Sequence, residues 1–227
     1  MSAAPSLLSA AWQIARKDLR QELRGKESLN AALSLTVVLL ILFSFAFDPA
    51  AEDSKQWSGG LLWLVYSFAG ALIVNRSFAR ELMNDCLEAL RASPVPSSAL
   101  FLGKAVACFL ILMGVELTAL PAFCVFYGVS LLGAPATFIA TLALTTWAVT
   151  VLGTMFSALT VNLHMRELML PVLVYPMLIP PLVAAIEITR GVITGEPVPE
   201  IWFRLLIGFD IIFTALAVAL AEVVLTD

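Results

Sequence analysis

The sequence is poor in charge and in the residues of soluble catalytic sites. Only 13% of its 227 residues are charged, and it contains one histidine, whereas 60% of its residues are apolar. A soluble domain could not cover that much apolar surface with polar side chains. The composition therefore excludes an ordinary soluble domain and indicates that lipid is the main solvent of this chain.

Two sequence patterns that carry chemistry are missing as well. The phosphate-binding pattern G-x-x-x-x-G-K-[ST] does not occur, so ATP is not expected to bind to this chain. The cysteines, Cys86, Cys108 and Cys124, form no CxxC or CxxxC pair and are interpreted as small apolar side chains. No Ser/His or Asp/Asp arrangement lies on adjacent apolar runs, which makes an intramembrane enzyme the weakest hypothesis.

Long runs with few or no charges dominate the chain. A helix needs about 20 apolar residues to cross the hydrocarbon of a bilayer. Such runs predict six transmembrane helices, over residues 29–47, 59–75, 105–131, 137–161, 168–186 and 205–225. The fold class is therefore predicted to be an all-α integral membrane protein with one transmembrane domain over residues 1–227. Prolines in the fifth run are expected to kink its helix.

The N-terminal segment, residues 5–27, has the pattern of a helix that lies in the membrane interface. Its apolar residues recur at helical spacing and comprise Leu8, Trp12, Ala15, Leu19 and Leu23. Basic residues occupy much of the remaining circumference, namely Arg16, Lys17, Arg20 and Arg24. The apolar stripe is expected to lie in the headgroup boundary while the basic side chains face anionic lipid. An ordinary soluble amphipathic helix fits less well, because a predicted span follows at once.

The positions of lysine and arginine predict the orientation. Ten of the 13 fall on one side of the predicted spans: Arg16, Lys17, Arg20, Arg24, Lys26, Arg76, Arg80, Arg91, Lys104 and Arg166. The other side has Lys55, Arg190 and Arg204. Because basic residues are enriched in cytoplasmic loops, both termini are predicted to be cytoplasmic. Residues 187–204, rich in glycine and proline, are predicted to form an external re-entrant or interfacial segment before the last span.

Residues 76–92, on the predicted cytoplasmic side between the second and third spans, are the most informative stretch. Their apolar and polar side chains separate onto two faces, which predicts a helix of about four turns. Ser93-Pro94-Val95-Pro96 then ends this helix, since proline donates no amide hydrogen bond and restricts the residue before it. One interpretation is a helix that only joins two spans. The other is a docking surface for a soluble partner, because a much shorter loop would have sufficed.

The order of these segments resembles the ABC-2 type permeases of ATP-driven exporters. Leu87-Glu88-Ala89-Leu90, Pro94-Val95-Pro96 and Gly103-Lys104 stand where that superfamily has a leucine-rich LE-x-L-like segment, a proline pair and a closing GK or AK. The chain length, RKDLRQELR before the first span and the run GLLWLVYSFAGALIVNRSFARE look most like the haem exporter protein B family of cytochrome c maturation. Asn84-Asp85-Cys86 departs from the acidic residue, glycine and small hydroxyl residue of many relatives.

The resemblance implies a non-catalytic permease subunit that binds no cofactor and pairs with a separate ATPase subunit, two copies of each. Residues 76–92 would be the coupling helix seated in a groove of the ATPase. The candidate docking residues in it are Arg80, Glu81, Asp85, Leu87, Glu88, Leu90 and Arg91. ATP would bind to the partner and haem would be the candidate cargo, with ATP use associated with release of a haem-loaded chaperone.

The resemblance also implies a place and further partners. The chain would be a multi-pass protein of the bacterial cytoplasmic (inner) membrane. It would act with other cytochrome c maturation membrane proteins and a periplasmic haem chaperone, and not with nucleic acid. Two alternatives remain: an ABC-2 permease that exports another lipid or hydrophobic compound, and a membrane assembly subunit that transports nothing.

Three ionisable side chains are candidates for a functional site. Glu116 and Asp210 lie inside predicted spans, where a carboxylate costs a few kcal/mol unless it is neutral, paired or hydrated. They are expected either to face a central pathway or subunit contact, or to be protonated and hydrogen-bonded to hydroxyls such as Thr118 or Thr214. His164 is a weak candidate for a haem ligand, because a lone histidine in a polar turn is more often solvated. No other metal ligand is predicted.

Overall fold

The computed structural model describes residues 6–47, 54–77, 96–160 and 166–226, and the regular structure within them is helical. The helices are α1 (Leu7–Gly25), α2 (Glu27–Ala46), α3 (Ser54–Asn75), α6 (Ser97–Tyr127), α7 (Pro135–Leu159), α8 (Arg166–Thr194) and α9 (Glu200–Thr226). Every one except α1 contains a stretch long and apolar enough to cross a membrane. The prediction of six spans in an all-helical protein is therefore confirmed.

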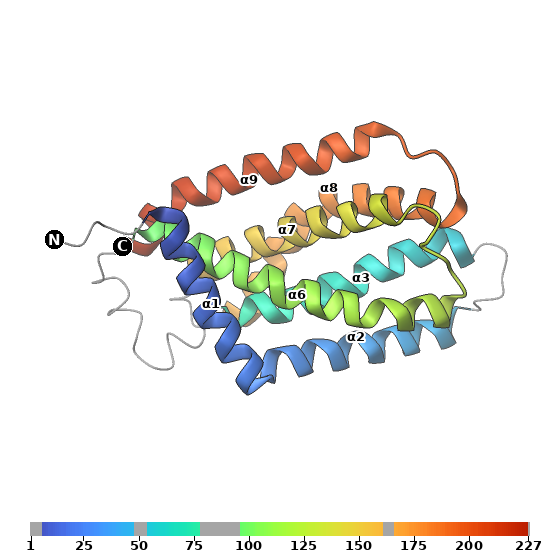
Figure 1. Cartoon of the computed structure of the whole chain (residues 1–227), viewed down its shortest axis with the longest axis horizontal. Coiled ribbons are helices and arrows are strands. Elements are labelled where there is room, and N and C mark those ends of the chain that lie inside the picture. Colours follow the sequence, from blue (N-terminus) through green and yellow to red (C-terminus); the bar gives the residue numbers. More distant parts are fainter. Residues whose placement is uncertain (1–5, 48–53, 78–95, 161–165, 227) are drawn as a thin grey trace.

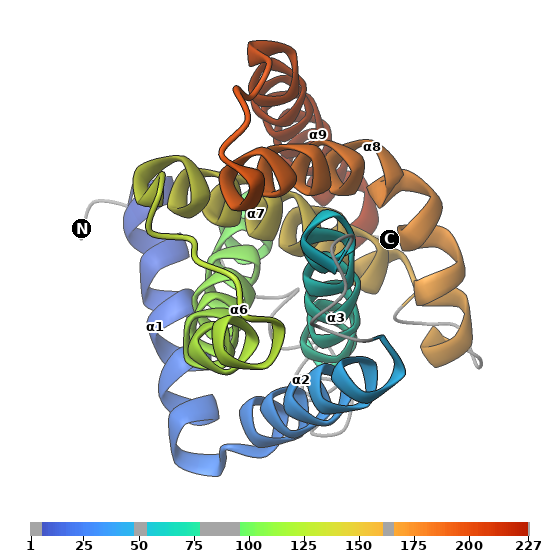
Figure 2. The same cartoon turned by 90° about the vertical axis from the view of Figure 1, so that its right-hand side faces the viewer.

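The six long helices run side by side, and α1 lies across one end of the bundle (Figure 1). In the view along the bundle α7 has neighbours on both sides, and it contacts α3, α6, α8 and α9 (Figure 2). Most of α7 is buried, whereas few residues of α2 and α9, at the edges of the bundle, are buried. The centre of the protein is thus the packing around α7, and apolar side chains on α2 and α9 face the surroundings.

The corner between α1 and α2 follows from local hydrogen bonds. The Ser6 hydroxyl accepts a hydrogen bond from the Ser9 amide at 3.4 Å and caps the start of α1. Lys26 ends α1 in the left-handed conformation, with φ of 56°. Glu22 Oε1 then accepts a hydrogen bond from the Leu29 amide at 2.9 Å, in the first turn of α2. This bond fixes the direction in which the first span leaves α1.

Several span boundaries differ from their predicted positions. The third span begins at Ser97 instead of residue 105 and ends at Tyr127, where Gly128 adopts φ of 59°. The prediction of a separate external segment over residues 187–204 is wrong, because residues 187–194 continue α8 and residues 200–204 begin α9. The connection that remains is residues 195–199, which start with Gly195 at φ of 78°.

The proline-rich fifth span is one continuous helix with a bend. Helix α8 contains four internal prolines, Pro171, Pro176, Pro180 and Pro181. Proline removes an amide donor and clashes with the preceding turn, and sharp bends in helices occur mostly at such positions. Figure 2 shows α8 changing direction along its length. Helix α8 contacts α3, α7 and α9.

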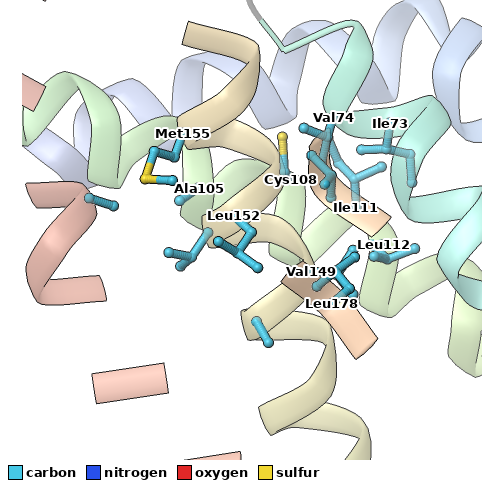
Figure 3. Close-up of a cluster of buried hydrophobic side chains, with 14 of the residues drawn as sticks. Ile73, Val74, Ala105, Cys108, Ile111, Leu112, Val149, Leu152, Met155 and Leu178 are labelled. Atoms are coloured by element: carbon cyan, nitrogen blue, oxygen red, sulfur yellow. The ribbon is translucent and has the colours of Figure 1, made fainter. Parts of the chain in front are cut away.

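Helices α3 and α7 interlock through two glycine–valine pairs. A Cβ atom on Gly153 would come 2.7 Å from Val74 Cγ1, and one on Gly70 would come 2.6 Å from Val149 Cγ1. Figure 3 shows Val74 and Val149 in the buried cluster formed with residues of α6 and α8. Because lipid tails are as apolar as the side chains, helices in a bilayer associate by such close packing. The interlock therefore fixes α3 against the central helix.

Aromatic side chains add hydrogen bonds between helices. Each pairs an indole or phenol donor with an oxygen of another span: Trp63 Nε1 with Thr189 Oγ1 at 2.9 Å, Tyr66 Oη with the Glu116 carbonyl at 2.9 Å, Tyr127 Oη with the Leu40 carbonyl at 3.2 Å and Trp147 Nε1 with Thr214 Oγ1 at 3.0 Å. These donors would otherwise be buried without a partner. Together they connect α3 to α8 and α6, α6 to α2, and α7 to α9.

The interlock predicts the effect of adding one methyl group. Gly153→Ala should lower the free energy of unfolding by about 1–3 kcal/mol, because the new Cβ overlaps Val74. Adding Val74→Ala should recover part of that loss by making room. The measurement is reversible unfolding in mixed micelles. Gly114→Ala is the matched control, since a Cβ there meets no atom within 4 Å. Equal losses in the two glycine variants would contradict the interlock.

Candidate functional site

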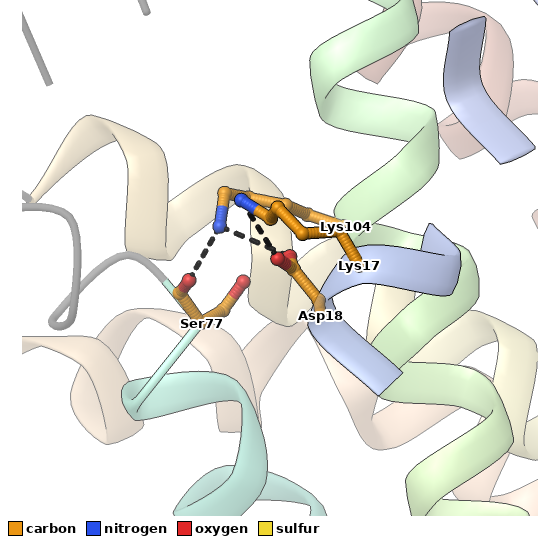
Figure 4. Close-up of polar contacts among 4 residues, drawn as sticks. All are labelled: Lys17, Asp18, Ser77 and Lys104. Carbon is orange, nitrogen blue, oxygen red and sulfur yellow. Dashed lines mark hydrogen bonds and ion pairs between the residues drawn. The ribbon is translucent and has the colours of Figure 1, made fainter. Parts of the chain in front are cut away.

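A buried lysine joins three helices at the end of the bundle crossed by α1. Lys104, near the start of α6, is 1% exposed. Its Nζ lies 3.3 Å from Asp18 Oδ2 on α1 and donates a hydrogen bond of 2.8 Å to the carbonyl oxygen of Ser77, which follows α3 (Figure 4). Lys17 Nζ lies 3.0 Å from the other oxygen of Asp18. We call Lys104, Asp18 and the Ser77 carbonyl the lysine junction.

The residue before this lysine brings α1 close enough for the contact. A Cβ atom on Gly103 would lie 2.7 Å from the carbonyl oxygen of Ala11 and 2.7 Å from Ile14 Cβ. Glycine is therefore needed for α6 to pack directly on the backbone of α1. Ala10, Ala11 and Ala99 form a small buried cluster at the same contact. Gly103 thus allows α6 to approach the backbone of α1, and Lys104 pairs with a carboxylate of α1.

Helix α1 turns its small and acidic residues toward the protein. Ala10, Ala11, Ala15 and Glu22 are buried, whereas Leu8 is 76% exposed and Trp12 57% exposed. Ile14 and Leu19 are half-buried, and Leu19 packs against the core of the bundle. The predicted apolar stripe is therefore divided: Ala15 and Leu19 face the protein, and Leu8, Trp12 and Leu23 are exposed.

A cavity of about 40 Å³ lies beside the lysine junction. Its lining combines apolar side chains with the charged residues Asp18, Glu22, Arg76 and Lys104. Its volume exceeds the ~10–15 Å³ that one water molecule needs. The cavity is therefore large enough to hold water beside the junction.

Glu116 lies in the protein interior, at the contact of three spans. The side chain is 1% exposed, and Thr146 Oγ1 of α7 donates to its Oε2 at 2.5 Å. Tyr66 of α3 donates to the backbone carbonyl of the same residue. A hydroxyl partner is one of the two sequence expectations for Glu116, but the hydroxyl belongs to Thr146 and not to Thr118, which donates to the Gly114 carbonyl of its own helix at 2.7 Å. Helix α7 carries five further buried residues with hydroxyl groups: Thr141, Thr145, Thr150, Thr154 and Ser157.

Asp210 lies on the peripheral helix α9 and faces inward. It is 7% exposed, and its two carboxylate oxygens have no hydrogen-bond partner among the described residues. Thr214, named as a possible hydroxyl partner, forms no bond with either oxygen of Asp210, and its Oγ1 accepts from Trp147 of α7. The described contacts do not join Asp210 to Glu116, so the two carboxylates occupy separate places in the bundle.

The remaining predicted site residues lie outside the described residues. These are the candidate docking residues Arg80, Glu81, Asp85, Leu87, Glu88, Leu90 and Arg91, together with His164. In the part of the chain that the structure describes, no group of three or more His, Cys, Asp or Glu side chains could hold a metal ion. The site that the structure adds is the lysine junction. Its sequence signals were an aspartate within a basic helix and a lysine at the start of an apolar run.

Comparison with known proteins gives a consistent family match. Residues 9–225 match the family model described as CcmB protein. Heme exporter protein B of Rhodobacter capsulatus is 33% identical over 207 residues, which is 90% of this chain and 91% of the relative. Heme exporter protein B of Paracoccus denitrificans is 29% identical, with 82% and 86% of the two chains covered. The Pseudomonas aeruginosa protein of that name is 27% identical, with 89% and 92% covered.

Proposed function

This chain belongs to the CcmB protein family, and from that membership we propose that it is the membrane permease subunit of a haem exporter for cytochrome c maturation. The observation that carries the proposal is the match over residues 9–225 together with relatives named Heme exporter protein B along most of their length. The six spans agree with a multi-pass membrane protein of this kind. The subunit is proposed to be non-catalytic and to bind no cofactor, with haem as the cargo.

The proposed membrane is the bacterial cytoplasmic (inner) membrane, with the α1 end of the bundle in the cytoplasm. Arg16, Arg20 and Arg24 lie on α1, and Arg76 and Lys104 lie at the same end of α3 and α6. The opposite end has Lys55, Arg190 and Arg204. This distribution supports the orientation, because basic residues are retained on the cytoplasmic side. Both termini would then be cytoplasmic.

Energy for export is proposed to come from a separate ATPase subunit, with two permeases and two ATPases in the complex. Residues 76–92 would be the coupling helix that docks on this ATPase, with ATP use linked to release of a haem-loaded periplasmic chaperone. The positions of Ser77 and Pro96 support the docking site, because they flank the segment at the α1 end of the bundle. Other cytochrome c maturation membrane proteins are the further proposed partners.

Glu116 and Asp210 are proposed to act in the interior of the working complex. Asp210 supports this role more strongly. A carboxylate without hydrogen-bond partners in a span is energetically costly, and such a residue usually has a function that outweighs the cost. Glu116 has a hydroxyl partner and joins α6 to α7, so its role combines assembly with export.

Deletion of the gene tests the proposed function directly. A strain without this chain should lose the haem stain of its c-type cytochromes on gels, and a plasmid copy should restore the stain. Unchanged staining would favour export of another lipid or hydrophobic compound. Loss of staining in the deletion strain, combined with no ATPase copurifying with the intact wild-type chain, would favour a non-transporting assembly subunit.

Charge reversal tests the coupling helix. Glu81→Lys and Glu88→Lys should reduce copurification of the ATPase or uncouple its turnover from cytochrome formation, because each reverses a charge on the proposed docking face. Glu196→Lys is the matched control, since this exposed glutamate lies in the connection between α8 and α9 at the other end of the bundle. Normal binding and turnover in both docking variants would remove the docking assignment.

Amide substitution tests the two carboxylates. Glu116→Gln and Asp210→Asn should insert normally, because each keeps the shape of the side chain and lowers the cost of burial. The yield of haem-stained cytochrome should nevertheless fall several-fold. Thr118→Val is the control, because its exposed hydroxyl bonds only within α6. Full cytochrome yield in both amide variants would mean that the carboxylates have no functional role.

A further inference from the structure

We propose that Lys104 is a positioning residue that makes α1, the end of α3 and the start of α6 move as one body during export. This inference rests on the proposed coupling to an ATPase and adds a named element to it, the lysine junction. The junction would carry movement at the flanks of residues 78–95 into the interfacial helix and the spans.

The first observation is that the junction is built in the interior and not on the surface. Lys104 is 1% exposed, and its amine contacts a carboxylate of α1 and a carbonyl of the residue that follows α3. A buried ammonium group without partners is strongly unfavourable, so a movement that removed Asp18 or the Ser77 carbonyl while Lys104 stayed buried would leave its charge uncompensated. The three elements are therefore held together more strongly than they would be by apolar packing alone.

The second observation is that α1 depends on α6 for its position. Helix α1 packs chiefly on α6 and only slightly on α2, apart from the corner bond between Glu22 and Leu29. Gly103 places the α6 backbone against Ala11, and the next residue supplies the charge. Close backbone contact and an ion pair at adjacent positions give α1 little freedom to slide along α6.

The third observation is where the junction lies along the chain. Ser77 is the last described residue before the proposed coupling segment, and Lys104 lies near the start of α6, which follows that segment. A force applied to the segment must leave it through these two flanks. Since both flanks bond to the same lysine, they transmit a common displacement, and Asp18 extends it to α1.

A junction that only stabilised the fold would have the same contacts. The test therefore needs a measurement on α1 that changes when nucleotide binds to the ATPase. The permease–ATPase complex would be purified in nanodiscs as wild type, Lys104→Met, Asp18→Asn and Lys104→Arg. Arg204→Met is the matched control, because it removes an exposed ion pair, Arg204 with Glu200 at 2.7 Å, at the other end of the bundle. Hydrogen exchange of α1 amides is compared with and without a non-hydrolysable ATP analogue. Cytochrome yield and ATP turnover are measured for each variant.

The proposal expects Lys104→Met and Asp18→Asn to keep the ATPase bound and turning over. Cytochrome formed per ATP should fall several-fold, because ATP turnover continues while its movement no longer reaches α1. The nucleotide-dependent change in α1 exchange should appear in wild type, Lys104→Arg and the control and disappear in the other two variants.

Three results would overturn the positioning role. One is a normal nucleotide response of α1 together with full cytochrome yield in Lys104→Met. Another is failure of every junction variant to insert while Arg204→Met inserts, since the junction would then be structural only. The third is a wild-type chain that binds no ATPase, which would reject the proposed coupling itself and this inference with it.

Discussion

Helices in lipid gain little from the hydrophobic effect, and this constraint explains how the bundle is held together. Lipid tails solvate an apolar side chain as well as another helix does, so association relies on close packing and on hydrogen bonds between spans. The structure shows both: Gly70 and Gly153 receive valines between α3 and α7, and four aromatic donors bond to oxygens of neighbouring spans. Helix α7 is the most buried span and contacts α3, α6, α8 and α9, whereas few residues of the edge helices α2 and α9 are buried within the protein.

The end of the bundle that carries α1 is held by charge as well. A buried ion pair lowers the cost that either charge would have if it were buried alone. Lys104 and Asp18 therefore occur as a pair at the contact of α1 with α6, while the interior contacts use hydroxyl, indole and phenol groups. Helix α1 is thus joined to the spans by charge and by close backbone approach, while Leu8, Trp12 and Leu23 remain exposed.

The number of spans could be predicted because uncharged runs have few alternatives to crossing a bilayer. The ends of the spans could not be predicted, because charged residues that form ion pairs within a helix continue that helix beyond its uncharged run. Glu187 pairs with Arg190 at 2.8 Å and Glu200 with Arg204 at 2.7 Å, within α8 and α9, so charges that suggested a loop belong to helices. The kind of partner of Glu116 could be expected, but its position could not, because residues near in sequence need not face each other: Glu116 accepts from Thr146 on another span. The lysine junction links positions 86 residues apart, and no local pattern indicates such a pair.

Under the proposed coupling, these contacts define a route from the cytoplasmic end into the membrane. A displacement of Ser77 moves the end of α3, which cannot slide along α7 unless Val74 leaves its place against Gly153. Because packed helices are bistable and not continuously deformable, α7 must move with α3 or the interlock must shift by a whole step. Movement of α7 then reaches α6 through Thr146 and Glu116 and α9 through Trp147 and Thr214. Asp210 lies one helical turn from Thr214, so a shift of α9 would change the surroundings of the one buried carboxylate that has no hydrogen-bond partner among the described residues.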